Sequence, residues 1–134
     1  MAWDLKGQVY FNRGDYAKAE TFFAKSIEYK INYTSAHYNR GITLLNTGNY
    51  VGAADEFKNS IKYGGHKFEF YKLLGMAYLN MNNHDSALQY LGYALQLRDN
   101  DAEVYNMIGQ AYQAKGDENT AFKYFSRAQK LMGS

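Results

Sequence analysis

The sequence predicts an all-α fold built from four stacked pairs of helices. The first observation is a glycine that recurs every 34 residues, as Gly7, Gly41, Gly75 and Gly109. The second is that a ring precedes each glycine by four residues and an alanine follows it by twelve: Trp3, His37, Tyr71 and Tyr105, and Ala19, Ala53, Ala87 and Ala121. A period of this length is typical of a stacked repeat array, in which each repeat buries the apolar face of its neighbour.

Each 34-residue repeat contains two segments with helical periodicity. In the third repeat, Tyr71, Leu74, Gly75 and Tyr78 follow the i, i+3, i+4, i+7 stripe of an amphipathic helix, and a second stripe begins at Ala87. We therefore expect eight helices, over residues 2–13, 16–29, 35–47, 50–63, 68–81, 84–97, 102–115 and 118–131. The repeats run over about 1–33, 34–67, 68–101 and 102–134, and we expect them to form one domain.

A polar pair stands between the two segments of every repeat. The pairs are Gly14-Asp15, Gly48-Asn49, Asn82-Asn83 and Gly116-Asp117. The first residue of each pair can take a positive φ and end one helix. The second can accept hydrogen bonds from the N–H groups that open the next helix. Turn chemistry and hydrophobic pattern therefore agree at four separate places.

The recurring small residues predict close contact between paired helices. A glycine in the middle of a helix costs about 1 kcal/mol relative to alanine, so four of them at one interval need a steric reason. We expect these glycines to leave room for the paired helix, and the recurring alanines to do the same from the opposite side.

These landmarks are similar to those of the tetratricopeptide repeat (TPR) family. In the first repeat the likeness is carried by Trp3, Gly7, Tyr10, Gly14, Asp15, Tyr16, Ala19 and Phe23, and it extends in phase over essentially the whole chain. The resemblance implies a right-handed α-solenoid of four helix-turn-helix repeats. It also implies a concave groove, lined by the first helix of each repeat, where ligands of the family lie.

Carried onto this chain residue by residue, the resemblance implies a peptide-binding surface on the first helices. Its candidate residues are Gln8, Phe11, Asn12, Tyr38, Asn39, Ile42, Leu45, Asn46, Lys72, Leu73, Met76, Leu79, Asn80, Asn106, Met107 and Gln110. Apolar members such as Phe11 and Leu79 are expected on a face wetter than the core, which is typical of an interaction surface. The alternative is that some of them, such as Leu73, are ordinary packing residues.

Asparagines recur at the same period on this face, as Asn12, Asn46 and Asn80. One interpretation is a ladder of amides that donates to and accepts from a peptide backbone. The other is that they mark helix ends ahead of the turns. Because charge is sparse on this face, the expected ligand is a largely neutral peptide or an amphipathic partner helix.

The chain departs from the family pattern in two respects. It contains no proline, although the family often has one at the end of each repeat. Lys6 and Arg40 stand where the family has leucine. A charged residue at Lys6 is understandable because no earlier repeat covers this position. For Arg40 the sequence offers only one explanation: its long apolar stem packs against the protein while the guanidinium reaches solvent.

Composition excludes several classes of function. The formal net charge is +2 and the basic residues are dispersed, so we expect no nucleic-acid partner. The absence of cysteine excludes disulfides, zinc–thiolate sites and thiol nucleophiles. No apolar stretch is long enough to span a bilayer, so no membrane partner is expected. Residues 1–15 lack the apolar run of a signal peptide, which predicts a cytoplasmic location.

The sequence also argues against an enzyme. His37 and His84 occupy ring positions of the repeat, and His66 stands in a linker. Neither a metal-binding histidine motif nor a phosphate-binding loop is present. Asp101 lies in a small acidic cluster but is better explained as a helix cap. We therefore expect no catalytic residue, no metal site and no cofactor.

The predicted function is a protein–protein interaction module that binds a peptide or partner helix in its groove. Two alternatives stay open. The chain can be a self-assembling structural scaffold, a homo-oligomer formed through its exposed end helices, for which Phe122 and Met132 would provide an apolar patch. It can also be a designed repeat with no natural ligand.

Overall fold

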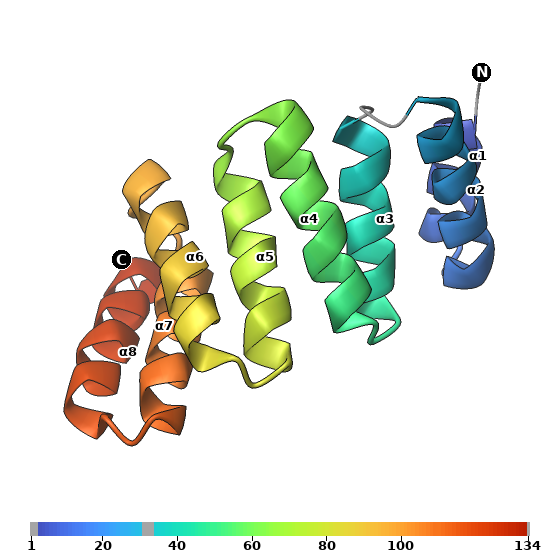
Figure 1. The fold of residues 1–134 in the computed structure, drawn as a ribbon. Helices are drawn as coiled ribbons and strands as arrows, with labels where there is room; N and C mark the ends of the chain where they lie inside the picture. Colours follow the sequence, from blue (N-terminus) through green and yellow to red (C-terminus); the bar gives the residue numbers. More distant parts are fainter. Residues whose placement is uncertain (1–2, 31–33, 134) are drawn as a thin grey trace. The chain divides into compact units, whose positions relative to one another are not determined.

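The computed structural model describes residues 3–30 and 34–133, and these residues form eight α-helices (Figure 1). The helices are α1 (Trp3–Asn12), α2 (Tyr16–Tyr29), α3 (Thr34–Asn46), α4 (Tyr50–Gly64), α5 (Phe68–Asn80), α6 (His84–Leu97), α7 (Ala102–Ala114) and α8 (Glu118–Gly133). The expected eight helices are confirmed, and every helix end lies within two residues of its expected position. The linker expected over residues 31–33 lies outside the described residues.

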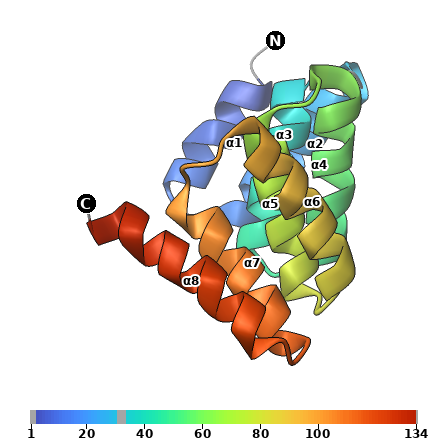
Figure 2. The ribbon, with the colours of Figure 1, turned by 90° about the vertical axis from the view of Figure 1, so that its left-hand side faces the viewer.

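The chain divides into two compact units, Met1–His66 and Lys67–Ser134. The first unit contains the hairpins α1–α2 and α3–α4, and the second contains α5–α6 and α7–α8. In each unit the second helix of one hairpin packs against the first helix of the next, α2 against α3 and α6 against α7. Figure 2 shows α7 and α8 running side by side as such a hairpin. The expectation of a single four-repeat domain stays a prediction.

The polar pairs form the turns as expected. Positive φ occurs at the first residue of every pair: 80° at Gly14, 84° at Gly48, 59° at Asn82 and 86° at Gly116. The second residue of every pair accepts a hydrogen bond through its side chain from the backbone N–H three residues later, at 3.0–3.3 Å. The chain therefore ends one helix and opens the next with the same two residues in all four repeats.

The recurring glycines lie where the paired helix approaches most closely. A Cβ atom on Gly7 would lie 2.5 Å from the Phe23 ring, and one on Gly75 would lie 2.5 Å from Leu91 Cγ. Gly41 and Gly109 meet the rings of Phe57 and Phe125 in the same way. The alanines that face them are fully buried or nearly so. The steric reason expected for the four glycines is confirmed.

Replacing Gly75 with alanine tests this close approach. We expect Gly75→Ala to destabilise the protein by about 1–3 kcal/mol, because the added methyl group overlaps the buried Leu91 side chain. Gly92 is the matched control, since it lies inside α6 with nothing within 4 Å of the position of a Cβ. We expect Gly92→Ala to stabilise by up to about 1 kcal/mol through helix propensity alone. Urea unfolding midpoints of the two variants measure the difference, and equal shifts would contradict the steric explanation.

Candidate functional site

The second unit contains a hollow of about 550 Å³ beside α5 and α7. It is lined by Met76, Leu79, Asn80, Asn82, His84, Glu103, Asn106, Met107 and Gln110. Six of the sixteen residues predicted from the sequence are among them, and these six come from α5 and α7. A hollow of this volume lies within the range of ligand sites in proteins.

The hollow combines an apolar wall with amide groups. Met76 and Leu79 are half-buried, and Met107 is 4% exposed, so Met107 contributes to the wall mainly from beneath. Within the described residues, the amides of Asn106 and Gln110 make no hydrogen bond to the rest of the chain. Apolar surface with a few polar groups is the usual composition of a site that binds a short segment of another molecule.

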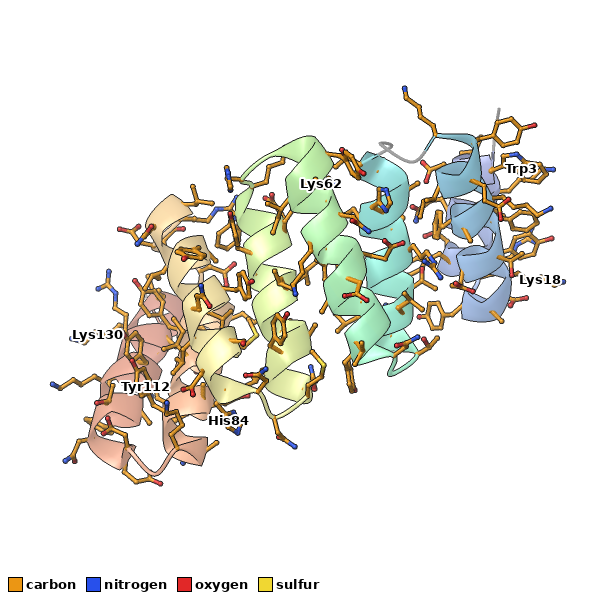
Figure 3. All side chains as sticks on the ribbon, in the orientation of Figure 1. Trp3, Lys18, Lys62, His84, Tyr112 and Lys130 are labelled. Carbon is orange, nitrogen blue, oxygen red and sulfur yellow. The ribbon has the colours of Figure 1, made fainter. Side chains whose placement is uncertain are left out.

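His84 adds an unusual polar atom to this hollow. Its Nδ1 atom is buried and has no hydrogen-bond partner among the residues that the structure describes. The side chain stands at the first residue of α6, labelled in Figure 3, and it lines the hollow. A buried nitrogen without a partner is costly, and such atoms are rare in native proteins. The sequence predicts His84 only as a packing residue.

Charges at the edge of the hollow are paired within the protein. Lys72 Nζ lies 2.7 Å from Glu103 Oε1 and 3.0 Å from Asp101 Oδ2. Burial alone would lower the pKa of Lys72, but the hydrogen bonds and charges of Glu103 and Asp101 outweigh it and raise the pKa above its ordinary value. Burial likewise opposes ionisation of Asp101, yet Lys72 and the Val104 N–H hold the pKa of Asp101 below its ordinary value. The ammonium of Lys72 is therefore neutralised locally.

Asp101 also accepts a hydrogen bond from the Val104 N–H at 3.1 Å, so its predicted role as a helix cap is confirmed. In the described residues, no group of three or more potential ligands is arranged to hold a metal ion.

The first unit contains a smaller hollow of about 80 Å³. It is lined by Gln8, Phe11, Phe23, Asn39 and Ile42, of which all but Phe23 were predicted from the sequence. Asn39 donates a hydrogen bond to Asp4 Oδ1 at 3.2 Å, which links α3 to α1 at its rim. This hollow is large enough for one small group.

The other six predicted residues do not line either hollow: Asn12, Tyr38, Leu45, Asn46, Lys72 and Leu73. Asn46 donates through its amide to the Ile42 carbonyl at 3.0 Å, and Asn80 donates to the Met76 carbonyl at 2.9 Å. These bonds stay within one helix, so they favour the helix-end interpretation of the recurring asparagines over the ladder. Asn80 still lines the larger hollow.

Sequence reasoning missed a partly buried charge network in the first unit. Arg40 donates to Glu20 Oε1 at 2.7 and 2.9 Å and to Glu56 Oε2 at 3.0 Å. His37 Nδ1 lies 3.0 Å from Glu56 Oε1, and Asn59 donates to the same oxygen at 2.9 Å. The guanidinium of Arg40 is therefore bound by two carboxylates of the protein and does not simply extend into solvent. Burial would lower the pKa of Arg40, but Glu20 and Glu56 raise it above its ordinary value.

The sequence does indicate such a network, because three residues of the second repeat depart from the repeat pattern. Arg40 replaces leucine and His37 replaces a ring of tyrosine or tryptophan. Glu56 stands where the other repeats have Phe22, Tyr90 and Tyr124. A carboxylate, a cation and an imidazole that all fall on packing positions are best satisfied by one another. Neither hollow is lined by His37 or Glu56, so the pair has no access to a ligand there.

Two units of paired helices with one period define an α-helical repeat protein. The chain belongs to the tetratricopeptide repeat family: one model of the Tetratricopeptide repeat matches residues 1–33, and a second matches residues 68–101 and 102–131. This family is a non-enzymatic interaction and scaffold fold, and its repeats mark the chain as a protein–protein interaction module. The expected family and fold class are confirmed.

Solved structures support the same fold. A crystal structure of MamA matches with a TM-score of 0.92 at 24% identity, over 98% of this chain and 77% of that chain. A structure of MamA from residue 41 to its end, from Desulfovibrio magneticus RS-1, matches with a TM-score of 0.92 at 25% identity, over 97% and 73%. No curated protein matches the chain. In the part of the chain that the structure describes, no helix is both long and apolar enough to cross a membrane.

Removing the central carboxylate of the charge network tests its importance. We expect Glu56→Gln to destabilise the protein by about 2 kcal/mol or more, because Glu56 is 4% exposed and its loss leaves His37 and Arg40 incompletely paired. Glu20→Gln is the matched control, since this carboxylate is 32% exposed and also pairs with Arg40. We expect it to cost less than about 1 kcal/mol. Urea unfolding measures both losses, and a Glu20 variant as unstable as the Glu56 variant would contradict the network as described.

Proposed function

We propose that the protein binds a short, largely neutral segment of another protein, either extended or helical, in the hollow beside α5 and α7, and that it catalyses no reaction. The observation that carries this proposal is the gathering of six sequence-predicted residues around one hollow of about 550 Å³. A site of this size accepts a few side chains of a partner rather than a whole domain. The expected dissociation constant is about 1–100 μM, or roughly −5.5 to −8 kcal/mol.

The apolar wall supports binding of one or two apolar side chains of the ligand. Met76, Leu79 and Met107 all line the hollow, and methionine has a flexible, polarisable side chain that adapts to varied shapes. Two methionines in one wall therefore favour a site that tolerates several apolar residues in the ligand.

The amide groups support recognition of the ligand backbone. Each amide of Asn106 and Gln110 offers both donors and an acceptor, which match the N–H and C=O groups of a peptide. The buried Nδ1 atom of His84 favours a ligand that brings a hydrogen-bonding group to this end of the hollow, a donor or an acceptor according to the tautomer of the ring. A segment with exposed backbone groups meets both demands.

Local neutralisation supports a ligand of low charge. Lys72, beside the hollow, is held by Asp101 and Glu103, and the residues that line the hollow include no lysine or arginine. Binding there would gain little from long-range attraction, so we expect it to change little with ionic strength.

Self-assembly is the second candidate function, and a separate observation favours it. Phe122 is 71% exposed and Met132 is 64% exposed on α8. Exposed apolar side chains on one helix are typical of surfaces that another chain covers. The two candidates differ in the residues that they would cover, which makes them separable.

Methionine methyl groups can report which surface is used. Met76 and Met107 line the hollow, whereas Met132 lies on α8. We would select a peptide from a random display library on the protein and follow the methionine methyl NMR signals during its titration. We expect the Met76 and Met107 signals to shift while Met132 stays unchanged, and we expect Leu79→Glu to weaken binding by about tenfold or more, because it buries a charge in the apolar wall.

Leu97→Glu provides the matched control, because Leu97 is 50% exposed on α6 and does not line the hollow. It should bind the peptide as the unmodified protein does. A peptide that binds equally well to the Leu79 variant, or that moves only Met132, would contradict the proposal. Shifts of Met132 that depend on protein concentration without peptide would support self-assembly.

A further inference from the structure

The first hairpin carries a stack of three aromatic rings on the side away from α3. The Phe22 ring stacks on Trp3 at 6.0 Å and on Tyr10 at 5.3 Å between ring centroids. All three side chains are only half-buried. Figure 3 shows Trp3 and Lys18 on the side of this hairpin that faces away from α3. We call this surface, made by Trp3, Tyr10, Phe22 and the cations over them, the end face.

Four cations cover the rings of the end face. Lys6 and Lys25 lie 5.1 and 4.8 Å from the Trp3 ring, and Arg13 and Lys18 lie 5.7 and 5.3 Å from the Tyr10 ring. All four are exposed, and within residues 3–30 and 34–133 none of them pairs with a carboxylate. A local excess of positive charge therefore lies on this face.

The last hairpin shows what covers an equivalent stack. There Tyr124 stacks on Tyr112 at 5.7 Å and lies 6.2 Å from Tyr105, three repeats after Phe22, Tyr10 and Trp3. In the second unit α6 packs against α7, and its Asp85 forms an ion pair with Lys115 of the α7–α8 turn. Lys115 stands at the repeat position of Arg13.

The first unit shows the same pattern at a second position. There α2 packs against α3, and its Glu20 pairs with Arg40 at 2.7 Å. Arg40 stands at the repeat position of Lys6. At each of these junctions a helix therefore covers the next hairpin and supplies a carboxylate to one of two defined cation positions.

These two carboxylates define the helix that would fit the end face. In repeat numbering, Asp85 corresponds to Ala17 of α2, which is three residues before Glu20. Residues three apart lie on one face of a helix. We infer that the end face docks an amphipathic helix of a partner protein that carries two carboxylates three residues apart near its N-terminus, one for Arg13 and one for Lys6. Its apolar side chains would cover the ring stack.

A second copy of this chain does not supply that chemistry. The last helix, α8, has Asn119 and Phe122 at the two carboxylate positions. Neither residue is acidic, so α8 of a second copy would leave Lys6 and Arg13 without a carboxylate partner. Charge complementarity therefore favours a different, acidic partner over self-stacking.

A helical peptide and the fluorescence of Trp3 test the inference. Trp3 is the only tryptophan of the chain, so its emission reports on the end face directly. The probe is a stapled peptide with the sequence of residues 16–29 and the change Ala17→Asp, which carries both carboxylates and no tryptophan. We expect saturable binding that weakens about tenfold in the Lys6→Glu, Arg13→Glu variant and weakens strongly with added salt, since two exposed ion pairs are reversed.

Two controls match this experiment in charge and in shape. The protein variant Lys62→Glu, Lys123→Glu changes the net charge equally on exposed residues of α4 and α8, and it should bind as the unmodified protein does. A peptide with Ala17→Asn and Glu20→Gln keeps the apolar face and should bind about tenfold more weakly. Circular dichroism verifies that the variants remain helical.

Several outcomes would overturn the inference. Equal binding of the amide peptide would mean that shape alone is recognised. An unchanged affinity in the Lys6, Arg13 variant would exclude these cations from the contact. A Trp3 response to single-stranded oligonucleotide or to anionic phospholipid vesicles, without a response to the acidic peptide, would assign the face to another ligand. A response to protein concentration alone would assign it to self-association.

Discussion

The contact between a glycine and a bulky side chain of the paired helix is the constraint on which the other features of each hairpin depend. At Gly7 and Gly75 a methyl group would overlap Phe23 or Leu91. Because the helices approach this closely, the turn between them can be made from two residues. The same closeness directs the remaining side chains outward, toward the neighbouring hairpin or toward the hollows. Position within the 34-residue period therefore determines which side chains pack and which are offered to a partner.

Ion pairs add specificity to the packing of neighbouring hairpins, which the apolar residues establish. At the junction of α2 with α3, Arg40 replaces an apolar residue and is balanced by Glu20 and Glu56. A buried ion pair seldom adds much stability over a well-packed apolar pair, but removing one partner is expensive. Such a network therefore penalises any displaced arrangement of the two hairpins more than the repeated apolar contacts would. His37 belongs to the same network.

The periodic features could be predicted from the sequence, and the pairwise ones could not. Helix ends, positive φ at Gly14 and capping by Asp15 follow from residue types at fixed spacing, so local chemistry decides them. The charge network around Arg40 joins residues of three helices, α2, α3 and α4, and no spacing rule joins residues that are distant in sequence. For the site, the predicted first helices contribute most of the residues around the two hollows, but Phe23, Asn82 and His84 come from other segments. Whether a residue lines a hollow depends on the direction of its side chain, which spacing alone does not give: the exposed Asn46 bonds to the Ile42 carbonyl of its own helix and lines neither hollow.

The two candidate binding surfaces would bind their partners through different interactions, because the charges near the hollow are paired within the protein and those on the end face are not. Beside α5 and α7 the ammonium of Lys72 is paired with two carboxylates of the protein, so we expect binding there to come from apolar contact and amide hydrogen bonds. On the first hairpin the cations rest on rings and keep their charge unbalanced. An ammonium over a ring can accept a carboxylate on its other side, because the ring occupies only one face of the cation. Arg13 and Lys6 thus stabilise the exposed rings and remain open to an ion pair. A partner of the hollow and a partner of the end face should therefore be told apart by salt alone.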